Sequence, residues 1–134
     1  MAVVDYNGNR VLLYNSIPST SGVAADIVLG AAGCATGTTS QTLNNPRGVW
    51  TDGTRVLVAD QLNHRVLVWN SWPTSNQQAA DFVLGQANMT SNTATVSASN
   101  MYYPHAVWSN GTQIVVAEIG SHRVLVFNSW PTAN

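Results

Sequence analysis

The octapeptide His64-Arg-Val-Leu-Val-Trp-Asn-Ser71 decides the fold, because close variants of it occur twice more in the chain. The other copies are Asn9-Arg-Val-Leu-Leu-Tyr-Asn-Ser16 and His122-Arg-Val-Leu-Val-Phe-Asn-Ser129. The intervening sequence repeats as well, since Ala25-Asp-Ile-Val-Leu-Gly30 returns as Ala80-Asp-Phe-Val-Leu-Gly85. A repeat of this length predicts an array of equivalent supersecondary units.

Each unit is predicted to contain four short strands. Gly48–Trp50 is the first, and it leads through Thr51-Asp-Gly-Thr54 into Arg55–Ala59, which is rich in β-branched residues. Asp-Gly is typical of tight hairpin turns in which both central residues have positive φ. The Arg-Val-Leu-Val segments form the third strands, and the Asp-x-Val-Leu segments form the fourth. No stretch has a sustained helical period, so the repeat predicts an all-β fold of β-propeller blades, each a four-stranded antiparallel sheet.

The chain holds about two and a half to three such blades, because the first and last units are incomplete. The first unit has its second to fourth strands, the middle unit has all four, and the last has its first to third. The blades are expected at residues 1–30, 46–85 and 104–134, joined by long loops at 30–45 and 85–103, within a single domain 1–134.

The amino-acid sequence of the repeat resembles that of a known family. Pro46-Arg-Gly-Val-Trp-Thr-Asp-Gly-Thr-Arg-Val-Leu-Val-Ala-Asp-Gln-Leu-Asn-His-Arg-Val-Leu-Val-Trp69 closely resembles the NHL repeat, which runs from Pro-x-Gly through a turn to Asn-His-Arg-Val. Residues 104–127 look like a second copy, with Glu118 for Asp60 and Ser121 for Asn63. The resemblance implies blades of a six-bladed propeller. It does not choose a function, because such propellers serve as protein-binding, RNA-binding, sensor and occasionally lyase domains.

A propeller needs at least about four blades to close, so this chain is too short to form a ring alone. An open arc would leave blade faces and sheet edges exposed. Either two chains associate into one six-bladed ring, or the chain is a segment of a longer propeller. We favour the homodimer, because the terminal units of a stable array must be covered.

The composition narrows the choice of partners. Only 8% of residues are charged, the net charge is −1 and there is no lysine. The chain therefore lacks the basic surface that a phosphate backbone needs, and we expect no nucleic-acid partner. We also expect no membrane span, and no signal peptide is recognisable, which leaves cytoplasmic and secreted locations both open. A lone cysteine, Cys34, excludes an intramolecular disulfide.

Most of the charged residues recur at the same position in each unit. Such residues are interpreted as structural, because an active site needs its groups at one place only. The acids and arginines would pair across each hairpin through charge-assisted hydrogen bonds, although a ring of carboxylates binding a metal is the alternative. The recurring charges are Asp5 with Arg10, Asp60 with Arg65, Glu118 with Arg123, and the pair Asp26 and Asp81.

The histidines and glycines do not form a recognisable chemical motif. His64 and His122 occupy one repeat position and are interpreted as hairpin residues, while His105 stands where the other unit has Arg47. Three histidines on separate hairpins do not provide the spacing of zinc ligands. Gly30-Ala-Ala-Gly33 lacks the spacing of a dinucleotide loop, so no cofactor and no catalytic residue is assigned.

Two groups of residues are better suited to recognition. The long loops lead into the same strand position, so they should emerge on one face, with His64 and His122 on the opposite face. On the long-loop face, Tyr102 and Tyr103 offer a stiff contact area with a polar tip. Trp72 and Trp130 are expected to pack between blades, or alternatively to form an aromatic contact surface. The binding residues predicted for the long-loop face are Arg47, Tyr102, Tyr103 and His105.

These observations predict a non-enzymatic binding or scaffold module that holds a protein, peptide or carbohydrate on the long-loop face. The alternative is part of a propeller enzyme, a lyase or hydrolase, with a metal in the central channel. A structural assembly unit without a ligand is the third interpretation.

Overall fold

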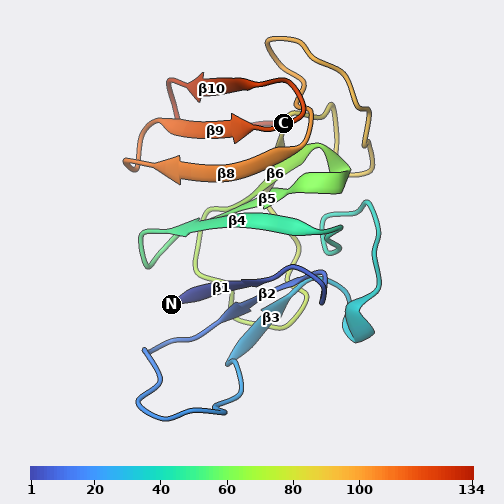
Figure 1. Ribbon diagram of the computed structural model, residues 1–134. Helices are drawn as coiled ribbons and strands as arrows, with labels where there is room; N and C mark the ends of the chain where they lie inside the picture. The colour runs from blue at the N-terminus through green and yellow to red at the C-terminus, as the bar shows by residue number, and fades with distance from the viewer.

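A computed structural model describes all residues, 1–134, as an all-β arc of three antiparallel sheets (Figure 1). The sheets have the strand orders β1-β2-β3, β4-β5-β6-β7 and β10-β9-β8, and we call them blades 1, 2 and 3. The predicted fold class is therefore confirmed, with partial blades on either side of a complete one. The strands are β1 (Ala2–Asp5), β2 (Arg10–Leu13), β3 (Ile27–Leu29), β4 (Pro46–Thr51), β5 (Val56–Asp60), β6 (Arg65–Trp69), β7 (Phe82–Leu84), β8 (Pro104–Ser109), β9 (Ile114–Glu118) and β10 (Arg123–Phe127).

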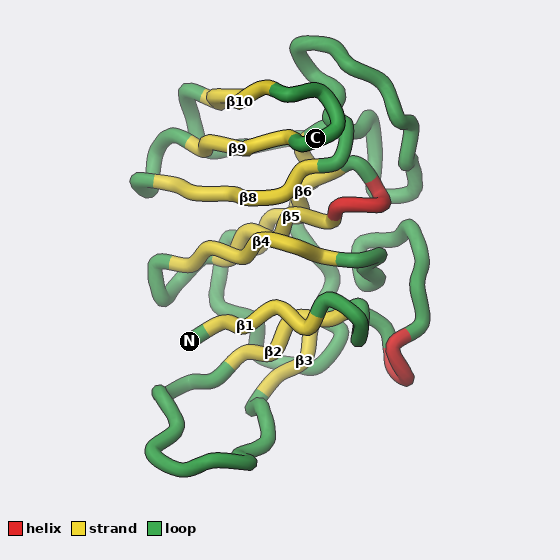
Figure 2. Tube along the Cα trace, viewed as in Figure 1, coloured by secondary structure: helices red, strands yellow, loops and turns green.

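Helix is confined to two short 3-10 turns, η1 (Ala32–Cys34) and η2 (Gln61–Asn63). Neither is long and apolar enough to span a membrane. Figure 2 shows both turns on the same side of the arc, where the long loops also lie. We call this side the loop face, because it carries the connections 30–45 and 85–103 together with the β1–β2, β5–β6 and β9–β10 hairpins.

The first strands of blades 2 and 3 lie close together. A Cβ atom added to Gly48 in β4 would stand 2.9 Å from the carbonyl oxygen of His105 and 3.0 Å from the Cα of Ala106 in β8. Only glycine allows this approach without a shift of backbone, so the Pro-x-Gly element of the repeat brings the innermost strands together.

The β4–β5 hairpin forms at Asp52-Gly53 as predicted, but its expected turn geometry is wrong in one respect. Only the glycine has positive φ, at 90°. Asp52 instead accepts hydrogen bonds through Oδ1 from the backbone N–H groups of Thr54 and Arg55, at 2.9 and 2.7 Å. Asn110 does the same for the β8–β9 hairpin. The acid or amide is therefore needed as an acceptor for turn amides, as short polar side chains often are in turns.

Alternate residues of each strand pack against the neighbouring blade, because successive side chains of a strand point to opposite faces. In β6, Leu67 and Trp69 belong to the core between blades 1 and 2, while Val66 and Val68 belong to the core between blades 2 and 3. Blade 2 therefore has both faces buried, and its four β6 residues named here are at most 1% exposed.

Two tryptophans, Trp72 and Trp130, connect neighbouring blades, as predicted from their position in the repeat. The Trp72 indole N–H donates to Asn15 Oδ1 at 2.9 Å, and Trp130 donates to Asn70 Oδ1 at 2.7 Å. Asn15 and Asn70 occupy the same repeat position, and each lies in the preceding blade. Trp72 also packs on the core between blades 1 and 2, and Trp130 on the core between blades 2 and 3. Their place between blades is thereby confirmed.

Candidate binding face

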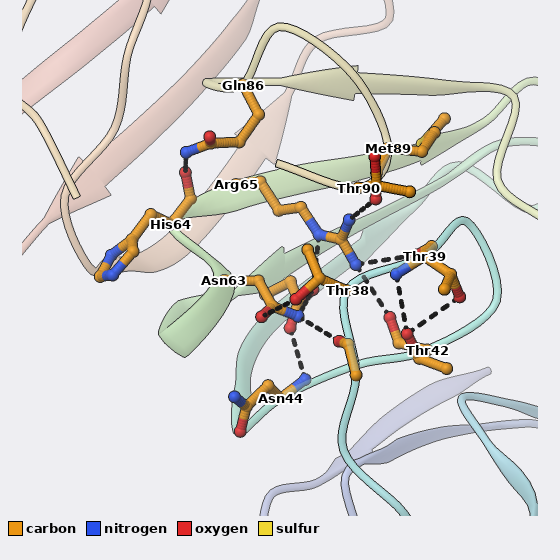
Figure 3. A network of polar contacts seen from close by, with 12 residues as sticks. Thr38, Thr39, Thr42, Asn44, Asn63, His64, Arg65, Gln86, Met89 and Thr90 are labelled. Atoms are coloured by element: carbon orange, nitrogen blue, oxygen red, sulfur yellow. Dashed lines mark hydrogen bonds and ion pairs between the residues drawn. The ribbon is translucent and has the colours of Figure 1, made fainter. Parts of the chain in front are cut away.

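The central feature of the loop face is a buried ion pair that fixes both long loops. Arg65 Nε donates to Asp60 Oδ2 at 2.7 Å, and both side chains are fully buried. The pair spans the β5–β6 hairpin, as the recurring spacing predicted. Figure 3 shows the guanidinium group at the centre of a polar network that reaches into both loops.

Arg65 uses its remaining N–H groups on loop carbonyls. Nη1 donates to the Met89 carbonyl, and Nη2 donates to the carbonyls of Thr39 and Thr42, at 2.9 and 3.0 Å (Figure 3). The backbone N–H of Asn44 in turn donates to Asp60 Oδ1 at 2.7 Å. One arginine thus supplies the donors that loops 30–45 and 85–103 need where their backbones are partly buried.

The equivalent pairs in the incomplete blades are formed but are less buried. Arg123 Nε donates to Glu118, whose side chain is fully buried, while the arginine is 24% exposed. In blade 1, Arg10 and Asp5 are paired at 2.7 Å with 39% and 32% exposure. Asp26 and Asp81 accept hydrogen bonds from the backbone N–H groups of Asn15 and Asn70. The predicted pairing of each acid with its arginine across the hairpin is confirmed by these contacts.

The surroundings of Asp5 and Asp60 shift the pKa values of the two carboxyl groups in opposite directions. The hydrogen bond from Arg10 lowers the pKa of the Asp5 carboxyl, because the ionised form is the better acceptor. Burial raises the pKa of the Asp60 carboxyl, while Arg65, the Asn44 amide and Asn63 act in the other direction. Desolvation therefore outweighs the stabilising contacts of the carboxylate in blade 2, whereas in blade 1 the hydrogen bond from Arg10 outweighs it.

Three aromatic rings gather where blade 3 begins. The Tyr102 and Tyr103 rings lie 4.4 Å apart between centroids, and the His64 ring lies 4.7 Å from Tyr103 and 5.4 Å from Tyr102. Both tyrosines are half-buried, and His64 is buried at 7% exposure. We call these three residues the aromatic cluster.

His64 lies beside the tyrosines, so the expectation that it occupies the opposite face is wrong. The β5–β6 hairpin and loop 85–103 emerge at the same end of blade 2, because β5 and β7 are both antiparallel to β6 and both run toward the loop face. The repeat could have revealed this, since the second and fourth strands of an antiparallel blade run in the same direction. His122 occupies the matching hairpin of blade 3, where its side chain is exposed.

The backbone holds the aromatic cluster in a fixed conformation. The Tyr103 N–H donates to His64 Nδ1 at 3.3 Å, and the equivalent Asn45 N–H donates to Asn9 Oδ1 at 2.8 Å. Tyr103 has φ of 54°, a conformation that few bulky residues adopt. The Tyr102 N–H donates to the buried Glu118 carboxylate at 2.7 Å. The Tyr103 backbone is thus held by the β5–β6 hairpin of blade 2, and the Tyr102 backbone by Glu118 at the end of β9.

His64 must be neutral to make its contact. Its Nδ1 accepts the Tyr103 N–H, so the ring proton is assigned to Nε2. Burial lowers the pKa of the His64 imidazole, which favours the same neutral form. The histidine near the tyrosines is therefore an acceptor at neutral pH.

The remaining predicted binding residues do not join the aromatic cluster. Arg47 is exposed, lies 3.8 Å from the centre of the Tyr6 ring, and donates to Gln61 Oε1 at 3.2 Å. It therefore links the loop-face hairpins of blades 1 and 2. His105 is exposed at the start of β8, and the ring contacts of the tyrosine pair are made with His64 instead.

No group of three or more His, Cys, Asp or Glu side chains lies close enough together to hold a metal ion. No family model matches the chain, and no curated protein is similar enough in sequence to count as a relative.

Proposed function

We propose that the protein is a non-enzymatic binding module of the NHL propeller type, with its ligand site on the loop face. The observation that supports this most is the aromatic cluster, in which Tyr102 and Tyr103 are half-buried and ordered by backbone hydrogen bonds. Rigid aromatic rings give a large contact area at a small entropic cost on binding. Arg47, exposed over Tyr6, adds a planar cation to the same face.

The ligand class that suits this face is a peptide or a loop of a protein. The loop face offers the stacking surfaces and neutral acceptors of the aromatic cluster and, apart from the cluster, the Arg47 guanidinium group, in a chain of net charge −1. Such a set favours polar or acidic peptides with an aromatic or aliphatic anchor, and it provides no basic track for a nucleic acid.

A displayed peptide library tests this proposal. Peptides selected on the wild-type protein should bind at least about tenfold more weakly to the Arg47→Ala variant, the loss expected for a charge-assisted contact. His105→Ala should also weaken binding, whereas His122→Ala is the matched control, because both histidines are exposed on loop-face segments. Selected peptides that bind all variants equally, or that bind variants only in proportion to lost stability, would overturn the proposal.

We further propose that a second copy completes the ring. Blade 3 exposes Val124 and Val126 at 60% and 55%, although the equivalent Val66 and Val68 of blade 2 are fully buried. At the other end of the arc, Val3 is 40% and Ile17 is 80% exposed. These faces occupy the positions that neighbouring blades cover inside the chain, so the blade 3 face of one copy fits the blade 1 face of another.

The new interfaces should be weaker than the internal ones. Ile17 stands where Trp72 and Trp130 stand in the other blades, and an isoleucine has no indole N–H to donate to Asn128. We therefore expect a dimer of twice the 14.3 kDa chain mass that dissociates on dilution.

Light scattering at several concentrations measures this directly. Val126→Lys should abolish the dimer, and Val96→Lys should not, although both valines are 55% exposed. A wild-type protein that stays monomeric and well folded at high concentration, or that forms a trimer, would refute the ring.

A further inference from the structure

Arg47 is the only arginine of the chain that has no acidic partner. The chain has no lysine and five arginines, and in the other four the Nε atom donates to a carboxylate of the same blade. Arg47 Nε donates instead to the neutral amide oxygen Gln61 Oε1, at 3.2 Å. The positive charge of Arg47 is therefore not compensated within the protein. The four compensated pairs are Arg10 with Asp5, Arg55 with Asp52, Arg65 with Asp60, and Arg123 with Glu118.

Two neighbours hold the guanidinium group of Arg47 and leave one of its edges free. Its Cζ atom lies 3.8 Å from the centre of the Tyr6 ring in the β1–β2 hairpin, so the ring covers one face of the planar group. Gln61 in η2 occupies Nε, while Nη1 and Nη2 have no partner in the protein. Stacking covers a face and not an edge, so the edge formed by Nη1 and Nη2 stays open. This edge matches the two oxygens of a carboxylate.

A β-bulge sets Arg47 apart from the strand ladder. The pairing of β4 with β5 skips Arg47, which is the extra residue of the bulge. The pairing of β8 with β9 skips His105 in the same way. Bulges re-aim a side chain and are common beside functional sites. The bulge thus recurs in both complete inner strands, while the side chain that it presents differs between the units.

The two bulges lie side by side at the loop-face end of the inner strands. A Cβ atom added to Gly48 would stand 2.9 Å from the His105 carbonyl oxygen, so β4 and β8 touch at the residue that follows Arg47. Gln61, only 5% exposed, reaches Arg47 from η2. Its Nε2 atom has no protein partner, and no buried side-chain nitrogen or oxygen lacks one, so this amide group is open to solvent. Arg47, Gln61 and the exposed His105 therefore offer N–H donors at the same end of two neighbouring strands.

We infer that Arg47, Gln61 and His105 form a subsite for a carboxylate group of the peptide ligand. Nη1 and Nη2 of Arg47 donate to the two carboxylate oxygens, Gln61 Nε2 donates to one of them, and a ring N–H of His105 contributes from the next blade. A single uncompensated cation suits a monoanion, and its planar fork suits a carboxylate. The inference rests on the proposed function for the source of this group, which is either the C-terminus or an acidic side chain of the peptide.

Acetate is the probe for the subsite, and acetamide is its neutral control of similar shape. An NMR titration of isotope-labelled protein, with sodium chloride balancing the ionic strength, follows the Nε–H signals of all five arginines and the Gln61 amide together. Acetate should shift the Arg47 and Gln61 signals and leave those of the four paired arginines in place. It should also bind at least about tenfold more tightly than acetamide, the difference expected for a charge-assisted contact.

Arg55 provides a matched control for Arg47. Its Cζ atom also lies over an aromatic ring, 4.1 Å from the centre of Trp130, but its charge is compensated by Asp52. Arg47→Gln should therefore weaken acetate binding at least about tenfold, while Arg55→Gln should leave it unchanged. A thermal melt shows that each variant is folded. Equal shifts at all five arginines, an acetamide affinity equal to that of acetate, or a folded Arg47→Gln variant that binds acetate normally would overturn the subsite.

Peptides selected on the loop face identify the source of the carboxylate. Amidation of the peptide C-terminus weakens binding if the terminus is held, and replacing an acidic residue by its amide weakens binding if a side chain is held. Peptides that tolerate both changes but still require Arg47 would overturn the carboxylate assignment and leave the proposed binding face intact. Acetate binding at Arg47 in a protein that selects no peptide would support the subsite and refute the proposed peptide-binding function.

Discussion

The three equivalent arginines give the sharpest test of how environment sets the strength of a repeated contact. Equal damage from alanine at each position is what the repeat alone predicts. The structure instead gives Arg65 full burial and four hydrogen-bond partners, Arg123 24% exposure and two, and Arg10 39% exposure and one. We therefore expect a graded series, with Arg65→Ala the most damaging and Arg10→Ala the least.

The magnitudes follow from what each substitution leaves unpaired. Arg65→Ala strands the fully buried Asp60 carboxylate and three loop carbonyls, so we expect a loss of about 3–5 kcal/mol, the range for a broken buried ion pair. Arg123→Ala leaves the buried Glu118 with the Tyr102 N–H and the Ser121 hydroxyl, so a loss of about 1.5–3 kcal/mol is expected. Arg10→Ala leaves a partly exposed carboxylate that water solvates, and its effect should be the smallest.

Urea unfolding followed by tryptophan fluorescence measures the series, with the slope of the transition checked for each variant. The double variant Asp60→Asn/Arg65→Met separates the pair from the loop contacts, because it removes the stranded charge. It should recover part of the stability that Arg65→Ala loses. Equal losses for Arg10→Ala and Arg65→Ala would refute the dependence on burial, and a double variant no better than Arg65→Ala would place the cost in the loops.

Further expectations concern the blade interfaces, pH and turn geometry. Trp130→Phe should destabilise by about 1 kcal/mol through loss of its indole hydrogen bond, while Trp108→Phe, 54% exposed, should change stability by less than about 0.5 kcal/mol in the same urea assay. Because burial lowers the pKa of His64 in the folded protein, the unfolded chain takes up that proton first, and stability should fall as pH drops below the ordinary value of 6.5. His64→Gln should flatten this slope in melts between pH 5 and 8. Gly53→Ala meets no atom within 4 Å but keeps φ of 90°, so a loss of about 1–2 kcal/mol would measure backbone strain alone.

The sequence predicts the blades well because each strand carries its own signal. The Arg-Val-Leu-Val segments and the Asp-x-Val-Leu segments alternate with turn residues, and they form the third and fourth strands as expected. The Asp52-Gly53 hairpin is also at its predicted place, although its aspartate acts as an acceptor and not as a residue of positive φ. Turn propensity predicts where the chain reverses direction, but the backbone N–H groups that each turn side chain binds depend on the folded geometry.

The aromatic cluster is harder to predict, because its members are far apart in sequence. His64 belongs to the hairpin of blade 2, whereas Tyr102 and Tyr103 precede the first strand of blade 3. The sequence shows that His64 recurs with Asn9 and His122, which favours a structural role. Only the contact between one blade and the next shows that this recurring position accepts an N–H from the following unit, Tyr103 for His64 and Asn45 for Asn9.

Contact with the next blade also explains why equivalent residues of different units differ in burial and in hydrogen bonding. Each blade completes the environment of the one before it, since Trp72 donates to Asn15, Trp130 to Asn70, and Tyr103 to His64. In blade 3, Asn128 Oδ1 accepts a hydrogen bond from Gln113 Nε2 of its own blade, and the side chains of His122, Val124 and Val126 are exposed. Each unit therefore carries the residues for one side of the interface with a neighbouring blade, and the neighbouring unit carries the other side. The second copy proposed above would present the complementary half, a blade face against Val124 and Val126.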